Sequence, residues 1–497
     1  MKFKHYIRLG IFSTWLISVW WLIRHEAFPE YFTSVIKGYH SLFSRDVLVK
    51  DLWYKIKFND RVVGFSNTTI DINENTPTHY YQIRNKLQLK LNLMGETHDV
   101  DASSEISLDM LHNLTRFSFS LSSQNYSTRI MGYRRSENSF AVTIRTGSNV
   151  HHTTVNIPPD VVFYSPMTEF MLKNLKPGQH ITIKTLDPIT MGVTPVRIRA
   201  LRYESVVHDG ESFKACVLSL DYQGQTFFSW ITEQGEILKQ ETPFGWQIEK
   251  CKPHEAIVLT KDSVDTDLLG RMAVASKGMI SSPRTCSFLK LKLSGVQFSM
   301  DELATERQRV ESLHPTNTVL VLTRPVLPDT EEISSTVNMK KWIASTPWIQ
   351  SDAQEMIRKA QTIVGDAKTQ WEKAVRIMQW VHKNMRKTPA VSIPSALDIL
   401  RRLEGDCNEH SYLFTALARS AGVPAKVIAG LTYHEGKFYY HAWVAVYIGG
   451  SWIEMDPTLG QELVDATHIL LASGELVEQL KLVKTLRRLE IEVLECR

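Results

Sequence analysis

Residues 404–410 read Glu-Gly-Asp-Cys-Asn-Glu-His and place a cysteine where a turn meets a helical pattern. Asp406 is among the side chains preferred at a helix N-cap. Gly422 and Pro424 supply stop signals further along. Between them, apolar residues recur with the spacing of an amphipathic helix, at Leu413, Phe414, Leu417, Ala418 and Ala421. The pattern predicts a helix of about 15 residues with Cys407 in its first turn.

This position favours a reactive thiol at Cys407. The partial positive charge at a helix N-terminus stabilises an anion, so it should lower the pKa of a thiol placed there. Cysteine is also a common inert core residue, but a position between Asp406 and Asn408 suits that role poorly. The sequence therefore predicts that Cys407 is a nucleophile with a depressed pKa.

Residues 440–455 alternate in the manner of a β-hairpin, with Gly449-Gly450 as a two-residue turn signal. A turn of that length pairs Ile448 with Ser451. A change of one residue in the turn would reverse which side chains share a face.

The same register predicts a base beside the thiol. It pairs His441 with Thr458 and makes Asp456 a diagonal neighbour of His441 on one face of the hairpin. The opposite face is apolar and reads as core. We expect His441 to act as the base for Cys407 and Asp456 to orient it. The alternative is a surface histidine that lies near an aspartate at a strand end.

Together these motifs resemble the core of the transglutaminase-like superfamily. The matching segments cover about residues 350–470: Gly405-Asp406-Cys407, residues 413–425, Tyr440-His441-Ala442-Trp443 and residues 452–458. The resemblance implies an α+β fold with a papain-like arrangement, in which helices pack on an antiparallel sheet. It also implies Cys407 as nucleophile, His441 as base and Asp456 as orienter. Residues 465–468 resemble the tail of bacterial members, without an assigned role.

Length and composition suggest a chain of several domains. At 497 residues, two or three domains are expected. The net charge of +4, with acidic and basic residues interleaved, gives no sign of nucleic-acid binding. The five cysteines are scattered, with no CxxC pair. Cys216 and Cys251 are the most plausible disulfide partners because both stand in a β-rich region, and unpaired core cysteines are an equally good interpretation.

Residues 9–23 form an apolar run, preceded by Lys2, Lys4 and Arg8. No small-x-small cleavage motif follows, so we expect an uncleaved signal anchor over residues 1–25. This predicts a chain anchored in the membrane by one N-terminal helix, with its bulk outside the cytoplasm, in the periplasm or the extracellular space. The alternatives are a cleaved signal peptide and a buried core helix.

Two larger regions follow the predicted anchor. Residues 48–330 are β-rich, and prolines near 158–195 suggest a join between two units. Residues 338–497 would form the transglutaminase-like catalytic domain. The β-rich region could be a spacer or a module that binds a substrate or partner, and its sequence does not choose between them.

The resulting hypothesis is a membrane-anchored thiol acyltransferase, or a cysteine peptidase or amidase, that forms an acyl-enzyme on protein or peptide amides. The acceptor is either an amine or water, and we expect neither cofactor nor metal. One alternative is an inactive transglutaminase-like scaffold that binds a partner at the membrane. Another is a metal site made by Cys407, His410, His441 and Asp456. The oligomeric state stays open.

Overall fold

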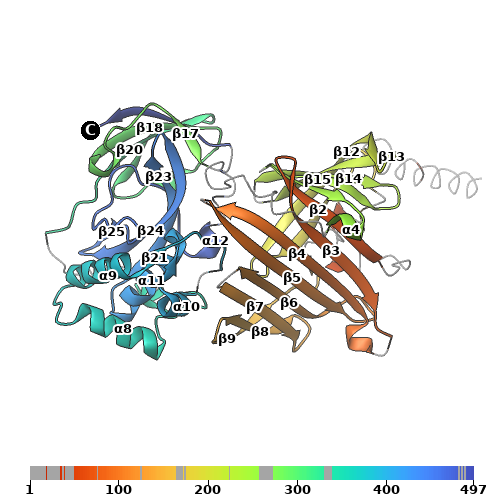
Figure 1. Cartoon of the computed structure of the whole chain (residues 1–497), viewed down its shortest axis with the longest axis horizontal. Helices are drawn as coiled ribbons and strands as arrows, with labels where there is room; N and C mark the ends of the chain where they lie inside the picture. Colours follow the sequence, from red (N-terminus) through yellow and green to blue (C-terminus); the bar gives the residue numbers. More distant parts are fainter. Residues whose placement is uncertain are drawn as a thin grey trace, which may run out of the picture.

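Two large β-sheets, one two-stranded sheet and their associated helices make up the described part of this chain (Figure 1). The computed structural model describes residues 18, 34–35, 38–39 and 50–497, except for 75, 94, 124–125, 164–171, 173–174, 223, 244, 257–272, 330–338, 394, 480–481, 483–484 and 486–487. Helices and strands occur in both parts, and the C-terminal part combines helices with a sheet that is antiparallel except where β17 pairs with β27. The fold class is therefore α+β, as the sequence predicts.

The N-terminal sheet has 16 strands in the described residues, in the spatial order β1-β11-β12-β13-β14-β15-β16-β2-β3-β4-β5-β6-β7-β8-β9, with β10 beside β11. Apart from the parallel β1 and β10, neighbours run antiparallel. The bounds are β1 Ser34–Val35, β2 Lys50–Phe58, β3 Arg61–Ile72, β4 Tyr81–Leu93, β5 Glu96–Leu108, β6 Leu114–Ser123, β7 Tyr126–Arg134, β8 Ser139–Thr146, β9 Asn149–Asn156, β10 Val161–Val162, β11 His180–Leu186, β12 Val193–His208, β13 Glu211–Tyr222, β14 Gln225–Thr232, β15 Ile237–Glu241 and β16 Trp246–Lys250.

Local sequence explains how these strands begin and turn. Asn59 and Asp60 both have positive φ, 48° and 64°, which is the conformation of a tight hairpin turn between β2 and β3. In β12, Val196, Ile198 and Ala200 are buried and alternate with exposed neighbours. Residues 158–195, where a join between two units is predicted, follow β9, include β10 and β11 and end within β12, all strands of this one sheet.

Within the described residues, the C-terminal sheet has nine strands, in the order β19-β20-β18-β27-β17-β24-β23-β26, with β25 beside β24. Its bounds are β17 Val274–Lys277, β18 Phe288–Ser294, β19 Gln308–Leu313, β20 Asn317–Thr323, β23 Ala425–His434, β24 Lys437–Ile448, β25 Ser451–Met455, β26 Ile469–Ser473 and β27 Glu490–Cys496. Residues 274–323 thus pair with the C-terminal strands, so the predicted β-rich region of 48–330 contributes to both sheets. The domain boundaries themselves stay a prediction.

Helices cover this second sheet, and α11 lies at their centre. The longer helices are α8 Gln354–Val364, α9 Gln370–Asn384, α10 Ala396–Arg402 and α11 Cys407–Ser420. The shorter elements are η3 Pro77–His79, α4 Pro253–Ala256, η5 Pro283–Thr285, α6 Met300–Leu303, α7 Lys340–Ile343, α12 Leu476–Gln479 and the two-stranded pair β21 Arg386–Lys387 and β22 Glu404–Gly405. Tyr412, Leu413 and Phe414 of α11 are fully buried, so this helix is part of the core and not a surface cover.

The predicted localisation, with one N-terminal membrane helix, is wrong. In the part of the chain that the structure describes, no helix has the length and apolar character needed to cross a bilayer. Apart from Ser18, the predicted anchor at residues 1–25 lies outside the described residues. The physical weakness of that prediction is length, because an apolar run of about 15 residues falls short of the roughly 20 that a spanning helix needs.

The N-terminal sheet contacts the segment that leads into α11. The Tyr126 hydroxyl, at the start of β7, donates to the Glu404 carbonyl over 2.7 Å. Near the end of β8, the Thr146 hydroxyl donates over 3.0 Å to Ser395, which caps α10. The start of β7 therefore contacts the backbone three residues before Cys407, and the end of β8 contacts the N-cap residue of α10.

We expect Tyr126→Phe to lower the free energy of unfolding by about 1 kcal/mol, because the hydrogen bond to the partly buried Glu404 carbonyl is lost. Urea unfolding measures this change. Tyr133→Phe is the matched control, since Tyr133 lies at the other end of β7 and is 45% exposed. Equal stability of the two variants would contradict a role for this contact.

Candidate active site

Cys407 is the first residue of α11, as the sequence predicts. Asp406 is the N-cap and its carboxylate accepts from the backbone N–H of Asn408 over 2.8 Å. Glu409 reaches back to the Asp406 N–H, also at 2.8 Å, and completes a capping box. Gly405 has φ +142°, and a Cβ there would collide with the Glu409 side chain. Glycine is therefore required immediately before this cap.

The predicted depression of the thiol pKa is wrong for the resting site. Burial raises the pKa of the Cys407 thiol well above its ordinary value, and the nearby carboxyl of Asp406 raises it further, while a hydrogen bond from the Ala442 backbone N–H lowers it. Burial and Glu409 in turn raise the pKa of Asp406. Desolvation and two adjacent carboxyl groups thus outweigh the helix N-terminus. The direction of this shift favours a neutral thiol in the resting site.

His441 and Asp456 meet at the open end of a hairpin. Ile448 pairs with Ser451 across Gly449-Gly450, which confirms the predicted turn. The ladder continues to the pair of Val444 and Met455 and ends there. Asp456 then forms a bridge with Gln461, so the predicted pairing of His441 with Thr458 does not form. The chain turns early because the Asp456 carboxylate accepts the backbone N–H groups of Thr458 and Leu459.

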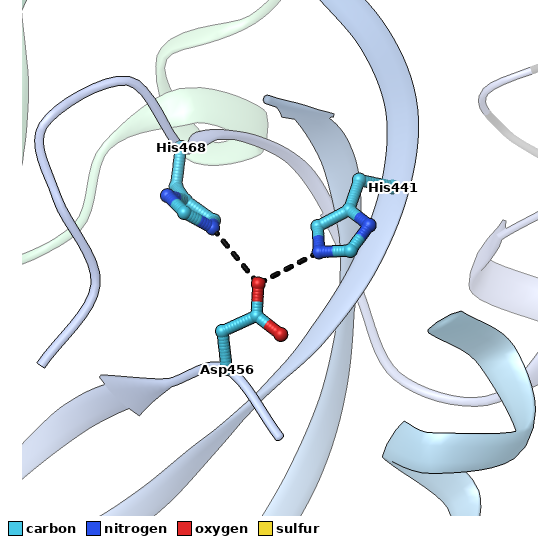
Figure 2. A group of neighbouring side chains, drawn as sticks. All are labelled: His441, Asp456 and His468. Carbon is cyan, nitrogen blue, oxygen red and sulfur yellow. Dashed lines mark hydrogen bonds and ion pairs between the residues drawn. The ribbon is translucent and has the colours of Figure 1, made fainter. Parts of the chain in front are cut away.

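A short hydrogen bond joins the two side chains. The Nε2 atom of His441 lies 2.7 Å from Oδ2 of Asp456, which is fully buried (Figure 2). Burial alone would raise the pKa of this carboxyl, but the charge and hydrogen bonds of His441 and His468 hold it far below its ordinary value. Asp456 is therefore ionised, and Nδ1 is the nitrogen of His441 that stays available.

Trp443 lies two residues after His441 in β24 and supports the orientation of the His441 ring. The two rings are close to parallel, with an interplanar angle of 20° and centroids 6.1 Å apart. The Trp443 indole N–H donates to Glu454 over 2.8 Å, and Arg307 also donates to that carboxylate over 2.7 Å. A buried and hydrogen-bonded indole thus provides a rigid wall beside the imidazole.

His468 is a member of the site to which sequence analysis gave no role. Its Nε2 lies 3.1 Å from Oδ2 of Asp456 (Figure 2). Its Nδ1 lies 3.2 Å from Oδ1 of Asp465. Asp465 in turn accepts from Arg284 at 2.9 Å. We call His441, Asp456, His468, Asp465 and Arg284 the relay cluster. The sequence feature that could have indicated this cluster is the polar segment Asp465-Ala466-Thr467-His468, which stands immediately before an apolar strand.

The relay cluster alternates in charge. Burial by itself would lower the pKa of His468, but its hydrogen bonds to Asp456 and Asp465 outweigh this and raise it. The pKa of Asp465 is depressed, because burial is outweighed chiefly by His468. A cation between two anions is the arrangement that lets ionised groups remain buried. His468 therefore holds Asp456 in place from the side opposite His441.

The predicted alternative metal site is not assembled as proposed. In the described part of the chain, the side chains that could share an ion are His441, Asp456 and His468, with ligand atoms within 4.8 Å of one another. Cys407 and His410 do not belong to this group. His410 instead uses Nδ1 to bond the Asp406 carbonyl at 2.7 Å, inside the first turn of α11. The three clustered side chains already satisfy each other by hydrogen bonds.

The relay cluster predicts how stability depends on pH. The depressed pKa values of Asp456 and Asp465 give stability that is full above about pH 4 and is lost as pH falls through their folded pKa values. The raised pKa of His468 gives stability that is full below about pH 6.5 and is lost as pH rises through its folded pKa. We therefore expect the melting temperature to be highest in mildly acidic solution.

Thermal unfolding from about pH 3 to about pH 9 tests this expectation. In His468→Gln the decline on the alkaline side should flatten, because the titrating group is gone. His434→Gln is the control, since the His434 side chain is 67% exposed, and it should keep the wild-type profile. An unchanged alkaline slope in His468→Gln would show that His468 does not titrate in this way.

Comparison with known proteins finds one family model that matches the region of this site. Residues 357–457 match the family model of the transglutaminase-like superfamily. The kyphoscoliosis peptidase of Mus musculus is 37% identical over 78 residues, which is 14% of this chain and 12% of that protein. The chain thus spans only a small part of this relative.

Solved structures give more distant likenesses. A proposed cysteine protease from Cytophaga hutchinsonii is 18% identical, with a TM-score of 0.30, over 41% of this chain and 82% of that one. The periplasmic domain of TgpA from Pseudomonas aeruginosa is 15% identical, with a TM-score of 0.23, over 39% of this chain and 92% of that one.

Proposed function

The C-terminal part of the chain carries a transglutaminase-like core, and on that premise we propose that Cys407, His441 and Asp456 are the catalytic triad of a thiol acyltransferase or peptidase. At the coarser level, the family supports a cysteine-dependent enzyme of this general kind that acts on proteins or peptides. The observation that carries the proposal is the buried 2.7 Å bond between His441 and Asp456, on the strand whose Ala442 N–H contacts the Cys407 thiol.

The first half-reaction forms a thioester. Because the resting thiol is neutral, His441 must remove its proton as the amide substrate arrives, through the nitrogen that Asp456 leaves available. The thiolate then attacks the amide carbonyl carbon. The backbone N–H of Cys407, at the start of α11, would stabilise the oxyanion. Protonated His441 gives its proton to the departing amine, which leaves an acyl-enzyme on Cys407.

The second half-reaction decides the enzyme class. Water as acceptor releases an acid and makes the protein a peptidase or amidase. A primary amine as acceptor forms a new amide and makes it a transglutaminase. In both cases His441 takes a proton from the acceptor and returns it to the Cys407 sulfur. Asp456 stays ionised throughout and stabilises the imidazolium that forms in each step.

The raised pKa of the Cys407 thiol favours a second candidate, an inactive scaffold that binds a protein partner. A scaffold has no use for a thiolate, and nothing would then oppose the desolvation of Cys407. The intact pairing of His441 with Asp456 favours the enzyme.

One assay separates these possibilities. The full chain is incubated with a glutamine-containing peptide, with and without a labelled primary amine, and the products are identified by mass spectrometry. A peptide linked to the amine, with release of ammonia, indicates a transglutaminase. Two peptide fragments indicate a peptidase, and a glutamine converted to glutamate with release of ammonia indicates an amidase. Cys407→Ala serves as the blank. If neither product forms and an electrophilic amide analogue does not label Cys407, the enzyme proposal is overturned in favour of the scaffold.

A further inference from the structure

We propose that Cys286 and Cys496 are a redox-active pair that closes to a disulfide and fastens the C-terminal strand β27 to the segment behind the relay cluster. The two sulfur atoms lie 2.7 Å apart, although 210 positions separate the residues in the chain. Two sulfur atoms at this distance are closer than non-bonded contact normally allows, and they need little movement to reach the covalent distance of about 2.0 Å.

The backbone around the pair is already fixed. In the ladder between β18 and β27, Cys496 lies opposite Leu289. The Arg497 carbonyl accepts hydrogen bonds from the backbone N–H groups of Ser287 and Phe288, at 2.7 and 3.0 Å. The backbone N–H of Arg497 donates to the Phe288 carbonyl over 2.9 Å. These bonds flank both thiols. The backbone thus pre-organises the pair, which is the geometric condition for forming a disulfide without distortion.

The two thiols differ in access, and this gives the order of the chemistry. Cys286 is 2% exposed, whereas Cys496 is partly exposed. Burial and the neighbouring sulfur raise the pKa of Cys286 to about 12. A small disulfide oxidant such as oxidised glutathione therefore meets Cys496 first, which attacks it and releases one thiol. Cys286 then attacks the mixed disulfide and releases the second thiol. The two protein thiols thereby lose two electrons and two protons, which reduce the oxidant to two thiols.

Cys216 and Cys251 are too far apart to form a disulfide with each other. The predicted pairing of Cys216 with Cys251 does not occur, because Cys216 lies on β13 and Cys251 follows β16, with β14 and β15 between them. Three strand spacings amount to about 14 Å, well beyond disulfide reach. Cys216 donates instead to the Leu175 carbonyl, 3.7 Å away.

The disulfide would act on the catalytic core in two ways. Its covalent loop from 286 to 496 encloses Cys407, His441 and Asp456. It also anchors the segment that carries Arg284, whose side chain donates to Asp465, while the Cys286 carbonyl accepts from the Ala466 N–H at 2.9 Å. Oxidation would thus stabilise the part of the relay cluster formed by Arg284 and Asp465.

Thiol counting on the full chain tests the pair directly. The protein is incubated with oxidised or reduced glutathione, unfolded, alkylated and weighed, and its peptides are mapped. We expect five alkylated cysteines after reduction and three after oxidation, with a cross-linked peptide that joins Cys286 to Cys496. Cys496→Ser should keep all four of its remaining thiols, whereas Cys216→Ser should still lose two. Five free thiols after oxidation, or a bridge that involves another cysteine, would overturn the proposal.

The stabilising effect of the disulfide is measured separately. Closing so long a loop should raise the melting temperature of the catalytic core by about 10 °C in the oxidised protein. The shift should vanish in Cys496→Ser and persist in Cys216→Ser. A mapped disulfide without such a shift would contradict the proposal that the disulfide fastens β27. Neither measurement uses enzyme activity, so its result is independent of the proposed function.

Discussion

Replacing Cys407 by alanine is expected to lower kcat by at least about 10⁴-fold, because no other group can form the acyl-enzyme. The fold should persist. Cys407 is the first residue of α11, and the capping bonds that start this helix come from Asp406 and Glu409, which the substitution leaves intact. The melting temperature should therefore change by no more than about 3 °C.

Turnover and mass labelling together measure this effect. Wild type should acquire one acyl group from a slow ester substrate at Cys407, and Cys407→Ala should acquire none. Cys251→Ala is the matched control, because Cys251 is a buried cysteine that lies in another part of the fold. Substantial turnover by Cys407→Ala, with the label on another residue, would show that the nucleophile is elsewhere.

Replacing Asp456 by asparagine is expected to lower kcat by about 10³-fold and to destabilise the protein by about 3 kcal/mol. The rate falls because an amide cannot stabilise the His441 imidazolium. The stability falls because His468, fully buried between Asp456 and Asp465, loses one of its two anionic partners. One substitution should therefore affect both catalysis and folding.

Steady-state kinetics and urea unfolding separate the two effects. We expect kcat to fall with little change in KM, since Asp456 is buried behind His441 and does not reach the substrate. Asp366→Asn is the control: its carboxylate pairs with Arg376 at 2.7 Å on the surface, and its loss should leave kcat unchanged. A rate for Asp456→Asn within threefold of wild type would contradict the role of Asp456, even if stability falls.

Sequence reasoning succeeded where the interactions are short in range. A cap residue and an apolar repeat encode the start of α11, and Gly449-Gly450 encodes the hairpin turn. The catalytic roles of Cys407, His441 and Asp456, which rest on these elements, stay a prediction. The register was right near the turn and failed beyond Val444, because the bonds from Thr458 and Leu459 to Asp456 end the ladder early. Hydrogen bonds from a side chain that end a strand in this way leave no periodic pattern in the sequence.

By itself the sequence determined the local elements of this protein: the capped helix of Cys407, the hairpin of His441, and the α+β character of the core. Tertiary structure alone decided the rest. It brought His468, Asp465 and Arg284 behind Asp456, paired Cys286 with Cys496, and raised the thiol pKa that the helix start should have lowered. The physical reason is that hydrogen bonds within a turn are set by neighbours in the chain. Desolvation and charge pairing depend on what packing brings together across hundreds of residues.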